Sequence, residues 1–307
     1  MIKRFSIRKI SKYTIILFIV FLFYMFPKKE EYTIEKSVMS HIKVDYHDIF
    51  LLDKNNYLSK TTIEVVSLNK DKLIDELIEI MTIDGKYQDK IPNGFRGILP
   101  IDTKLISKTL EDNTLTLNFN KNLLDTKQEE LVIEAIIYTM TSIDNIDNVK
   151  IMIEGNKLDK LPKTGKNLDD ILNRNYGINK VYDIQNLKNI TKVTIYYINK
   201  TNQDIIYYVP VTKYMNSKEE KIKIIIDELT SKISYESNLM SYLNYNTKLL
   251  DYSFNENEID LNFNEYLFDN NHNKKVLEEV IYSISYSLED TYNVSKINFY
   301  VNNKEIK

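Results

Sequence analysis

The three histidines of this 307-residue chain are the first residues to consider as metal ligands or acid–base catalysts. His41 and His47 lie close to Asp45 and Asp48. Histidine ligands of one metal ion commonly lie three or four residues apart on a helix, whereas these two lie six apart in a predicted strand. His272 has no counterpart in the internal repeat described below. We therefore predict no metal site and no cofactor.

Two pairs of neighbouring carboxylates offer a second kind of chemistry. Glu129 and Glu130, like Glu278 and Glu279, lie at the start of predicted helices. Paired carboxylates can act as general acid and base, but acidic residues near a helix start also stabilise the helix dipole. The chain contains no G-x-S-x-G nucleophile motif and no cysteine that could act as a nucleophile. We therefore predict no catalytic residue and a protein that is not an enzyme.

Two further features could contribute to a binding surface. Residues 91–100 contain two glycines and an arginine and are predicted to form either a binding loop or a mobile surface loop, which we favour. Tyrosine is enriched at interfaces, so the tyrosine-rich stretches could line a face that binds a saccharide or a protein, although biased composition explains them equally well. These tyrosines are Tyr196, Tyr197, Tyr207, Tyr208, Tyr242 and Tyr245.

The composition excludes several classes of protein. Hydrophobic residues make up 43% of the chain, which is enough to build globular cores. The absence of cysteine excludes disulfides, thiolate zinc sites and attachment through a lipidated cysteine. Six glycines are too few and too scattered for phosphate-binding loops. With 41 Lys and Arg against 44 Asp and Glu, the chain has no basic excess, so we predict no nucleic-acid partner.

The N-terminal segment is typical of a membrane anchor. Residues 1–12 hold five basic residues and no acid, and residues 13–26 form an uncharged apolar run. The run ends in Tyr24-Met25-Phe26-Pro27, which does not resemble the small-residue cleavage site of a signal peptide. Five positive charges precede the run and two follow it. The positive-inside rule then predicts a single-pass protein with residues 1–29 as basic cytoplasmic tail and transmembrane helix, and the remainder outside the cytoplasm.

The remainder of the chain is an internal repeat. Residues 117–120 (LNFN) recur at 261–264, and 137–140 (IYTM) recur as 281–284 (IYSI), both at an offset of 144. Residues 74–77 (IDEL) recur at 226–229, and residues 91–100 account for the longer offset of this block. We predict two homologous modules, 42–160 and 190–307, joined by a linker over 161–189.

Each module shows the same order of periodic segments. Period-two alternation around Asn- and Asp-rich turns predicts strands, and apolar residues three and four apart predict helices. The order is a hairpin, a helix, two strands, a second helix and a last strand. The fold class is therefore α+β, with a small mixed sheet and two helices on one of its faces in each module. Pro210 indicates an edge strand or a bulge, and Ser217 is predicted to cap a helix. The predicted ranges are 48–52, 57–66, 70–81, 104–110, 114–120, 127–142 and 149–154 in the first module, then a short helix near 168–174 in the linker, and 192–198, 204–212, the helix after 217, 248–254, 258–264, 273–288 and 296–301 in the second.

The order of these segments, read with their residues, resembles the GerMN domain. The matching stretches are PIDTKLIS (100–107), LTLNFN (115–120), EAIIYTMT (134–141) and VKIMIEG (149–155), with Asp102 where the family often has glycine. The second module is more divergent and ends in Val301-Asn302-Asn303 in place of the family's Glu-Gly. The resemblance covers nearly all of the chain after residue 42, as two tandem copies.

The resemblance implies a function that the residues alone do not. It implies a non-enzymatic, extracytoplasmic sporulation and germination factor with a structural role in the channel between mother cell and forespore. It also implies protein partners or self-association through module faces. The alternative is a cell-surface binding module for cell wall polymer or peptide, for which the tyrosines and residues 91–100 are the candidate surface.

Overall fold

The computed structural model describes residues 18, 21, 33–35, 46–65, 69–231, 238–268 and 274–306. The predicted anchor over residues 13–26 lies outside this range except for Phe18 and Phe21, which are helical. His41, Asp45 and His272 also lie outside it. Among the described residues, no helix combines the length and apolar character needed to cross a membrane.

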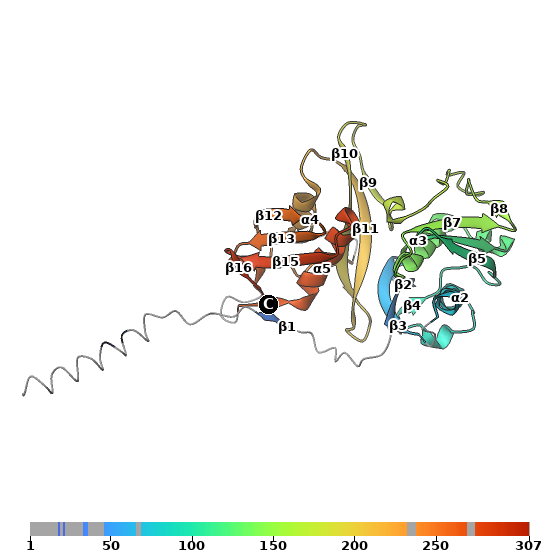
Figure 1. Ribbon diagram of the computed structural model, residues 1–307, viewed down its shortest axis with the longest axis horizontal. Helices are drawn as coiled ribbons and strands as arrows, with labels where there is room; N and C mark the ends of the chain where they lie inside the picture. The colour runs from blue at the N-terminus through green and yellow to red at the C-terminus, as the bar shows by residue number, and fades with distance from the viewer. Residues whose placement is uncertain are drawn as a thin grey trace, which may run out of the picture.

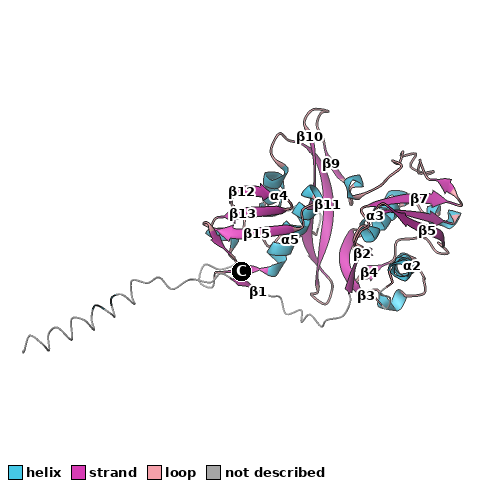
Figure 2. Cartoon of the chain, in the orientation of Figure 1, coloured by secondary structure: helices cyan, strands magenta, loops and turns pink. Residues whose placement is uncertain are grey.

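The first module begins with a hairpin and ends with a small mixed sheet (Figures 1 and 2). In the sheet β5-β6-β7-β8, β6 runs antiparallel to β5 and parallel to β7. Asn69 caps the first helix by accepting the N–H of Asp71. The elements are β2 (Tyr46–Asp53), β3 (Leu58–Glu64), α2 (Lys70–Met81), β4 (Phe95–Arg96), β5 (Leu105–Glu111), β6 (Thr114–Phe119), α3 (Glu129–Met140), β7 (Asn148–Ile153) and β8 (Asn156–Lys157), with short 3₁₀ turns η1 (Gln88–Lys90) and η2 (Lys121–Leu124).

The second module repeats this order. Its sheet β12-β13-β15-β16 has the same pattern of parallel and antiparallel pairs. The connecting segment holds η3 (Arg174–Tyr176) and β9 (Val181–Asp183). The elements of the module are β10 (Ile190–Lys200), β11 (Ile206–Asn216), α4 (Lys221–Thr230), β12 (Leu249–Asn255), β13 (Glu258–Phe263), η5 (Glu265–Leu267), β14 (Lys275–Leu277), α5 (Glu278–Tyr292), β15 (Lys296–Val301) and β16 (Lys304–Glu305).

The helices of each module lie between two sheets, so the prediction of one sheet covered on one face is wrong. Helix α3 contacts β2 on one side and β7 on the other. Figure 1 shows α4 and α5 between the long hairpin β10–β11 and the sheet of β12, β13 and β15. The hairpins pair with each other instead of joining the sheets of their own modules, and apolar residues on both sides of the helices fill the two interfaces. The mixed sheets themselves agree with the prediction.

The two hairpins combine into one sheet across the modules, in the order β10-β11-β3-β2-β4, with β9 paired to β11. Among the described residues, β11 meets β3 at Tyr208 and Lys60. A hydrophobic core lies within each module, and Phe95 packs against both. The modules therefore share a backbone hydrogen-bonding surface and an apolar contact.

Pro210 lies in an interior strand, which the prediction of an edge or bulge did not anticipate. Its partner Tyr196 donates its N–H to Ser287 of α5, so this pair is not hydrogen-bonded across β10 and β11. The ring nitrogen of Pro210 therefore faces the gap between the part of β11 that pairs with β3 and the part that pairs with β9. No described strand residue pairs with β11 there, so the N–H group that proline lacks is not required. The position tolerates proline because the sheet is interrupted there.

Three predicted helix features are wrong. Residues 275–277 form β14, not the start of a helix, because they pair in parallel with β1 (Thr33–Glu35). Residues 168–173 form no helix, since Leu172 bridges to Val149, and the short 3₁₀ helix η3 begins only at Arg174. Ser217 does not cap α4, which begins at Lys221, and the N–H of Ile222 donates to the hydroxyl of Tyr292 on α5.

Residues 91–100 are held by backbone hydrogen bonds and buried side chains and do not form the mobile surface loop that we favoured. Ile98 and Leu99 are buried, and both donate their N–H groups to the carbonyl of Met81. Phe95 and Arg96 form β4 beside β2. A Cβ at Gly97 would lie 2.6 Å from the carbonyl oxygen of Met81, so the close backbone approach requires glycine. The insertion is thus a packed element that borders the junction between the modules.

Candidate functional site: the junction between the modules

A partly buried arginine joins the two modules. Arg174 of η3 forms an ion pair with Asp290 of α5, whose side chain is only 3% exposed. The Nε of Arg174 donates to Thr141 Oγ1 at 3.0 Å and its terminal nitrogen to Ser142 Oγ at 2.8 Å, both at the end of α3. Asp290 also accepts the hydroxyl of Tyr196 at 2.7 Å. With these partners the charges are compensated, and removal of Arg174 leaves the buried carboxylate of Asp290 without its ion pair.

Asn179 fills the interruption in the shared sheet. Its Oδ1 accepts the N–H of Leu58 at 3.0 Å, and its Nδ2 donates to the carbonyls of Leu58 and Pro210 at 2.7 Å each. Its own N–H donates to Glu134 Oε2 at 2.8 Å. The φ of 46° is in the left-handed region, which asparagine tolerates better than most residues. One side chain thus replaces the missing ladder bonds between β3 and β11.

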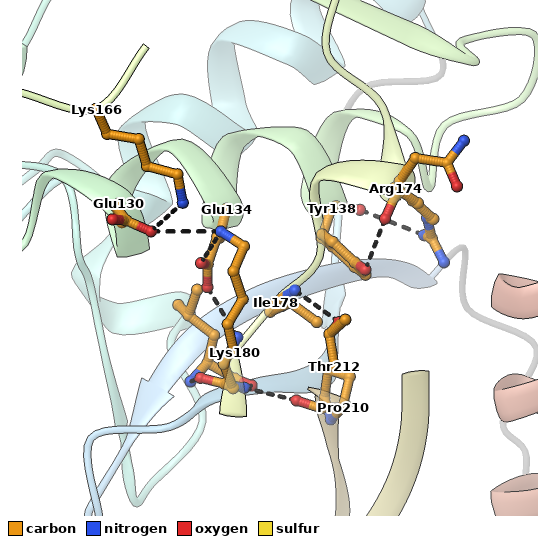
Figure 3. Close-up of polar contacts among 12 residues, drawn as sticks. Glu130, Glu134, Tyr138, Lys166, Arg174, Ile178, Lys180, Pro210 and Thr212 are labelled. Carbon is orange, nitrogen blue, oxygen red and sulfur yellow. Dashed lines mark hydrogen bonds and ion pairs between the residues drawn. The ribbon is translucent and has the colours of Figure 1, made fainter. Parts of the chain in front are cut away.

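The connecting segment, predicted as a linker over residues 161–189, is bound to α3 by a second network of hydrogen bonds and ion pairs (Figure 3). Lys180 Nζ lies 2.7 Å from Glu134 Oε1, and both side chains are almost fully buried. Burial raises the pKa of Glu134 and lowers the pKa of Lys180. Lys166 pairs with Glu130 at 2.7 Å. Glu129 accepts the N–H groups of residues 163 and 164.

The predicted carboxylate pairs therefore serve different roles. Glu129 and Glu130 hold the connecting segment against α3, so they form part of the structure of the first module. Glu278 and Glu279 begin α5 and line a groove at the junction. Sequence reasoning missed Arg174, Asn179 and Lys180, and their signal was a cluster of polar residues in a segment that we took for a linker.

The groove at the junction has a volume of about 620 Å³. Tyr208 on β11 and Tyr282 and Tyr286 on α5 supply its aromatic wall, and Tyr282 and Tyr286 are stacked with ring centres 5.5 Å apart. Lys60 Nζ lies 3.7 Å from the ring centre of Tyr286 and 2.7 Å from Asp48 Oδ2. The lining residues are Asp48, Lys60, Thr61, Thr62, Pro92, Asn93, Phe95, Thr201, Asp204, Ile205, Ile206, Tyr207, Tyr208, Glu278, Glu279, Tyr282 and Tyr286.

The six tyrosines considered from the sequence do not form one face. The Tyr196 ring is buried, and Tyr197 is buried with its hydroxyl bonded to Glu228. Tyr207 bonds to Asp53 at 2.9 Å and borders the groove together with Tyr208. Of the remaining two, Tyr242 is half-buried and Tyr245 is 74% exposed. The four-residue spacing of Tyr282 and Tyr286 on a predicted helix was the signal that could have identified the groove.

The described residues were predicted to hold no metal site. No group of three or more His, Asp and Glu residues there is arranged to hold a metal ion. His47 lies in β2 opposite Ile63, and Asp48 pairs with Lys60. The junction offers a hydrogen-bonded and ion-paired connection and a groove lined by aromatic and acidic residues.

A family comparison identifies the class of protein. A model of the Germane family, described as "Sporulation and spore germination", matches residues 48–159 and 194–307, which together make up most of the chain. The chain belongs to this family. The tandem arrangement and the resemblance to the GerMN domain that the sequence predicts are confirmed.

Comparisons with individual proteins show which members of the family the chain resembles. The chain is 29% identical over 271 residues to "Spore germination protein GerM" of Bacillus subtilis (strain 168), covering 84% of this chain and 71% of that protein. It also resembles the solved structure "Tandem GerMN domains of the sporulation protein GerM from Bacillus subtilis", with a TM-score of 0.76, 27% identity and coverage of 85% and 92%. The solved first GerMN domain of the same protein matches with 26% identity, a TM-score of 0.40 and coverage of 43% and 99%. The family match and the similarity to the Bacillus subtilis protein over 271 residues support a role in sporulation or germination.

Proposed function

We propose that this protein is a non-enzymatic assembly factor of the sporulating cell, held outside the cytoplasm by a membrane anchor at residues 13–26. Its place of action is the channel between mother cell and forespore. The observation that carries the proposal is an exposed apolar surface that is repeated on two modules joined by a shared sheet. Membership of the Germane family supports a function in sporulation, and the arrangement of the two modules supports the structural role.

The repeated surface consists of exposed apolar residues at equivalent positions in both modules. Ile106 on β5 is 54% exposed and Leu250 on β12 is 52% exposed, and they are separated by the repeat offset of 144. The pairs Ile101 and Tyr245, and Leu110 and Phe254, show the same correspondence. Exposed apolar side chains tend to be scattered, whereas here their positions recur in two divergent modules.

The outer strands β5 and β12, which carry four of these residues, are also paired on one side only among the described residues. Among the described residues, β5 pairs only with β6, and β12 pairs only with β13. Each strand contains an irregularity near its start, between Leu105 and Ser107 and between Leu249 and Asp251. Because one chain presents two such surfaces, one on each module, it can contact two neighbours at once, which allows assembly into larger structures.

The assembly role is tested by site-specific photo-cross-linking in sporulating cells. The photoreactive residue p-benzoylphenylalanine replaces Ile106 or Leu250, and Leu187, which is 91% exposed, serves as the control position. We expect cross-linked species at 106 and 250 and none at 187. Equal labelling at all three positions, or none at 106 and 250, contradicts a role for the repeated surface.

The anchor is tested by protease accessibility in protoplasts. An epitope tag after Lys307 becomes cleavable from outside if the modules lie beyond the membrane, and a tag before Met1 stays protected. Deletion of residues 13–26 is expected to release the protein from the membrane fraction. A protected C-terminal tag in intact protoplasts would contradict the proposed orientation.

The groove favours a second candidate function, binding of cell wall polymer or peptide. Aromatic rings beside carboxylates are a common lining of ligand sites, and the volume is in the range of such sites. Pelleting of the detergent-solubilised chain with purified peptidoglycan measures retention by the polymer. Retention that is lost in Tyr282→Ala but not in Tyr245→Ala would support wall binding, and the absence of retention would contradict it.

A further inference from the structure

The lining of the groove at the junction carries an excess of negative charge. It contains four carboxylates, of Asp48, Asp204, Glu278 and Glu279, and among the described lining residues only Lys60 is cationic. Lys60 pairs with Asp48 at 2.7 Å. Four carboxylates against one lysine, beside the tyrosine rings of the wall, attract a further cation by charge.

The rings of the groove already hold a cation of this chain. Lys60 Nζ lies 3.7 Å from the ring centre of Tyr286, within the range of a cation–π interaction. Tyr282 stacks beside Tyr286 and is partly exposed, on the same helix as Glu278 and Glu279. Lys60 is bound between an aromatic ring and a carboxylate, those of Tyr286 and Asp48. One turn earlier on α5, the ring of Tyr282 and the nearby carboxylates offer the same combination. A lysine or arginine side chain from another molecule fits this position.

The first module also contributes backbone hydrogen-bonding groups. Phe50 donates its N–H to Thr139 of α3, so it faces away from its partner Lys60 on β3. In an antiparallel pair of this kind, both residues point their N–H and C=O groups away from each other. Lys60 therefore points its backbone groups toward β11. Thr62, two residues further along β3, turns its N–H and C=O the same way and lines the groove.

The second module mirrors this arrangement. Ile198 donates its N–H to the carbonyl of Met240 at 2.8 Å, so its partner Tyr208 on β11 faces β3. Ile206, two residues earlier, faces the same way and lines the groove. In the part of the chain that the structure describes, no pair joins the strands between Thr62 and Ile206. The strands diverge there, and their backbone groups point into the space between them.

We propose that this groove binds an extended segment of a partner protein that carries a lysine or arginine. The cation lies against Tyr282 and is paired by Glu278 and Glu279, and the backbone of the segment pairs with Thr62 or Ile206. Added strands of this kind gain affinity from main-chain bonds and specificity from side-chain pockets. The identification of the occupant as a protein rests on the proposed assembly function.

The site requires both modules and the insertion in the first. Pro92, Asn93 and Phe95 of residues 91–100 form one border, and the β10–β11 turn at Asp204 and Ile205 forms the other. The second module lacks an equivalent of the insertion. The groove is therefore a product of the junction and is not repeated within a module, unlike the exposed surface at Ile106 and Leu250.

The test uses the full-length chain in detergent micelles and a fluorescein-labelled peptide of alternating lysine and threonine. A peptide with glutamate in place of lysine is the control ligand. Fluorescence anisotropy measures the Kd. We expect the lysine peptide to bind at least about tenfold more tightly than the glutamate peptide, which corresponds to about 1.4 kcal/mol.

Matched variants locate the binding. Tyr282→Ala, and Glu278→Gln combined with Glu279→Gln, are each expected to weaken binding of the lysine peptide about tenfold. Tyr266→Ala and Glu256→Gln remove an exposed tyrosine and an exposed acid of the same module and are expected to change the Kd less than twofold. Thermal melting of each variant shows that the fold is retained.

Two results would overturn the groove proposal. One is equal binding of the lysine and glutamate peptides, and the other is binding that the groove variants leave unchanged. Neither result bears on the repeated surface, whose cross-links at positions 106 and 250 test the assembly function separately. Conversely, absence of those cross-links with intact peptide binding would contradict the assembly surface and retain the groove.

Discussion

The second helices of the two modules, α3 and α5, occupy equivalent positions in the repeat but have different surroundings. All residues of both helices are described. Ten of the twelve residues of α3 are buried, whereas only six of the fifteen residues of α5 are buried. The connecting segment and the hairpin β2–β3 cover α3, while α5 exposes Tyr282 to the groove. The difference indicates that the first module supplies a rigid base and the second presents a surface.

The largest predicted effect is the loss of the arginine that joins these two helices. Arg174→Ala leaves Asp290 buried without its ion pair, and we expect the free energy of unfolding to fall by about 3–5 kcal/mol. Urea denaturation measures the change. Lys192→Ala, at a half-buried site outside the ion pair, is the control and is expected to cost about 1 kcal/mol or less. A similar cost for both variants would contradict a joining role for Arg174.

Equivalent truncations compare the two helices directly. Ile137 of α3 is fully buried, and Ile281 of α5, at the same position of the repeat, is partly buried. We expect Ile137→Ala to cost about 3–4 kcal/mol and Ile281→Ala about 1–2 kcal/mol, because the cost follows the apolar contact that is lost. Equal costs in urea denaturation would show that the helices are buried alike and would remove the basis of the comparison.

The asparagine in the sheet interruption is expected to have an intermediate effect. Asn179→Ala leaves the backbone groups of Leu58 and Pro210 without their side-chain partner, at an expected cost of about 1–3 kcal/mol. Asn189→Ala, another asparagine of positive φ on the connecting segment but exposed, is the control. Hydrogen exchange of Leu58 should accelerate in Asn179→Ala only. Unchanged exchange would show that Asn179 does not maintain the pairing of the hairpins.

A pH effect on the base of the molecule is the smallest prediction. Burial raises the pKa of Glu130, but Lys166 and Lys180 lower it further, so the net shift is downward. Its contribution to stability is therefore present above the pKa of the unfolded chain and is lost as the pH falls through the lower folded-state pKa. Glu130→Gln should lose less stability than the parent chain between about pH 5 and pH 3. A steeper loss in the variant would contradict this sign.

The periodic elements were predictable from sequence because local patterns determine them. Helix α2 begins and ends at the predicted residues 70 and 81, and β15 matches the predicted 296–301. The start of α5 was not predictable, since β14 forms by pairing with β1, more than 200 residues away in sequence. Likewise, Lys221 begins α4 where a hydroxyl from α5 accepts the N–H of Ile222.

The candidate site was less accessible to sequence reasoning than the fold. Its residues come from β3, the insertion, β11 and α5, and only tertiary structure brings these segments together. The insertion was recognised, but its anchoring depends on bonds from Ile98 and Leu99 to Met81. Arg174 and Asn179 lie in a segment without periodicity, so no local pattern identified their roles.

The most direct test of the central claim is the yield of heat-resistant spores in a strain that lacks this gene. The full chain supplied from a second locus is the control for restored function, and a chain with Ile106→Asp and Leu250→Asp tests the repeated surface. We predict that the deletion lowers the yield by orders of magnitude, that the full chain restores it, and that the double variant does not. Normal yield and normal germination of spores without the gene would contradict the assembly role in sporulation.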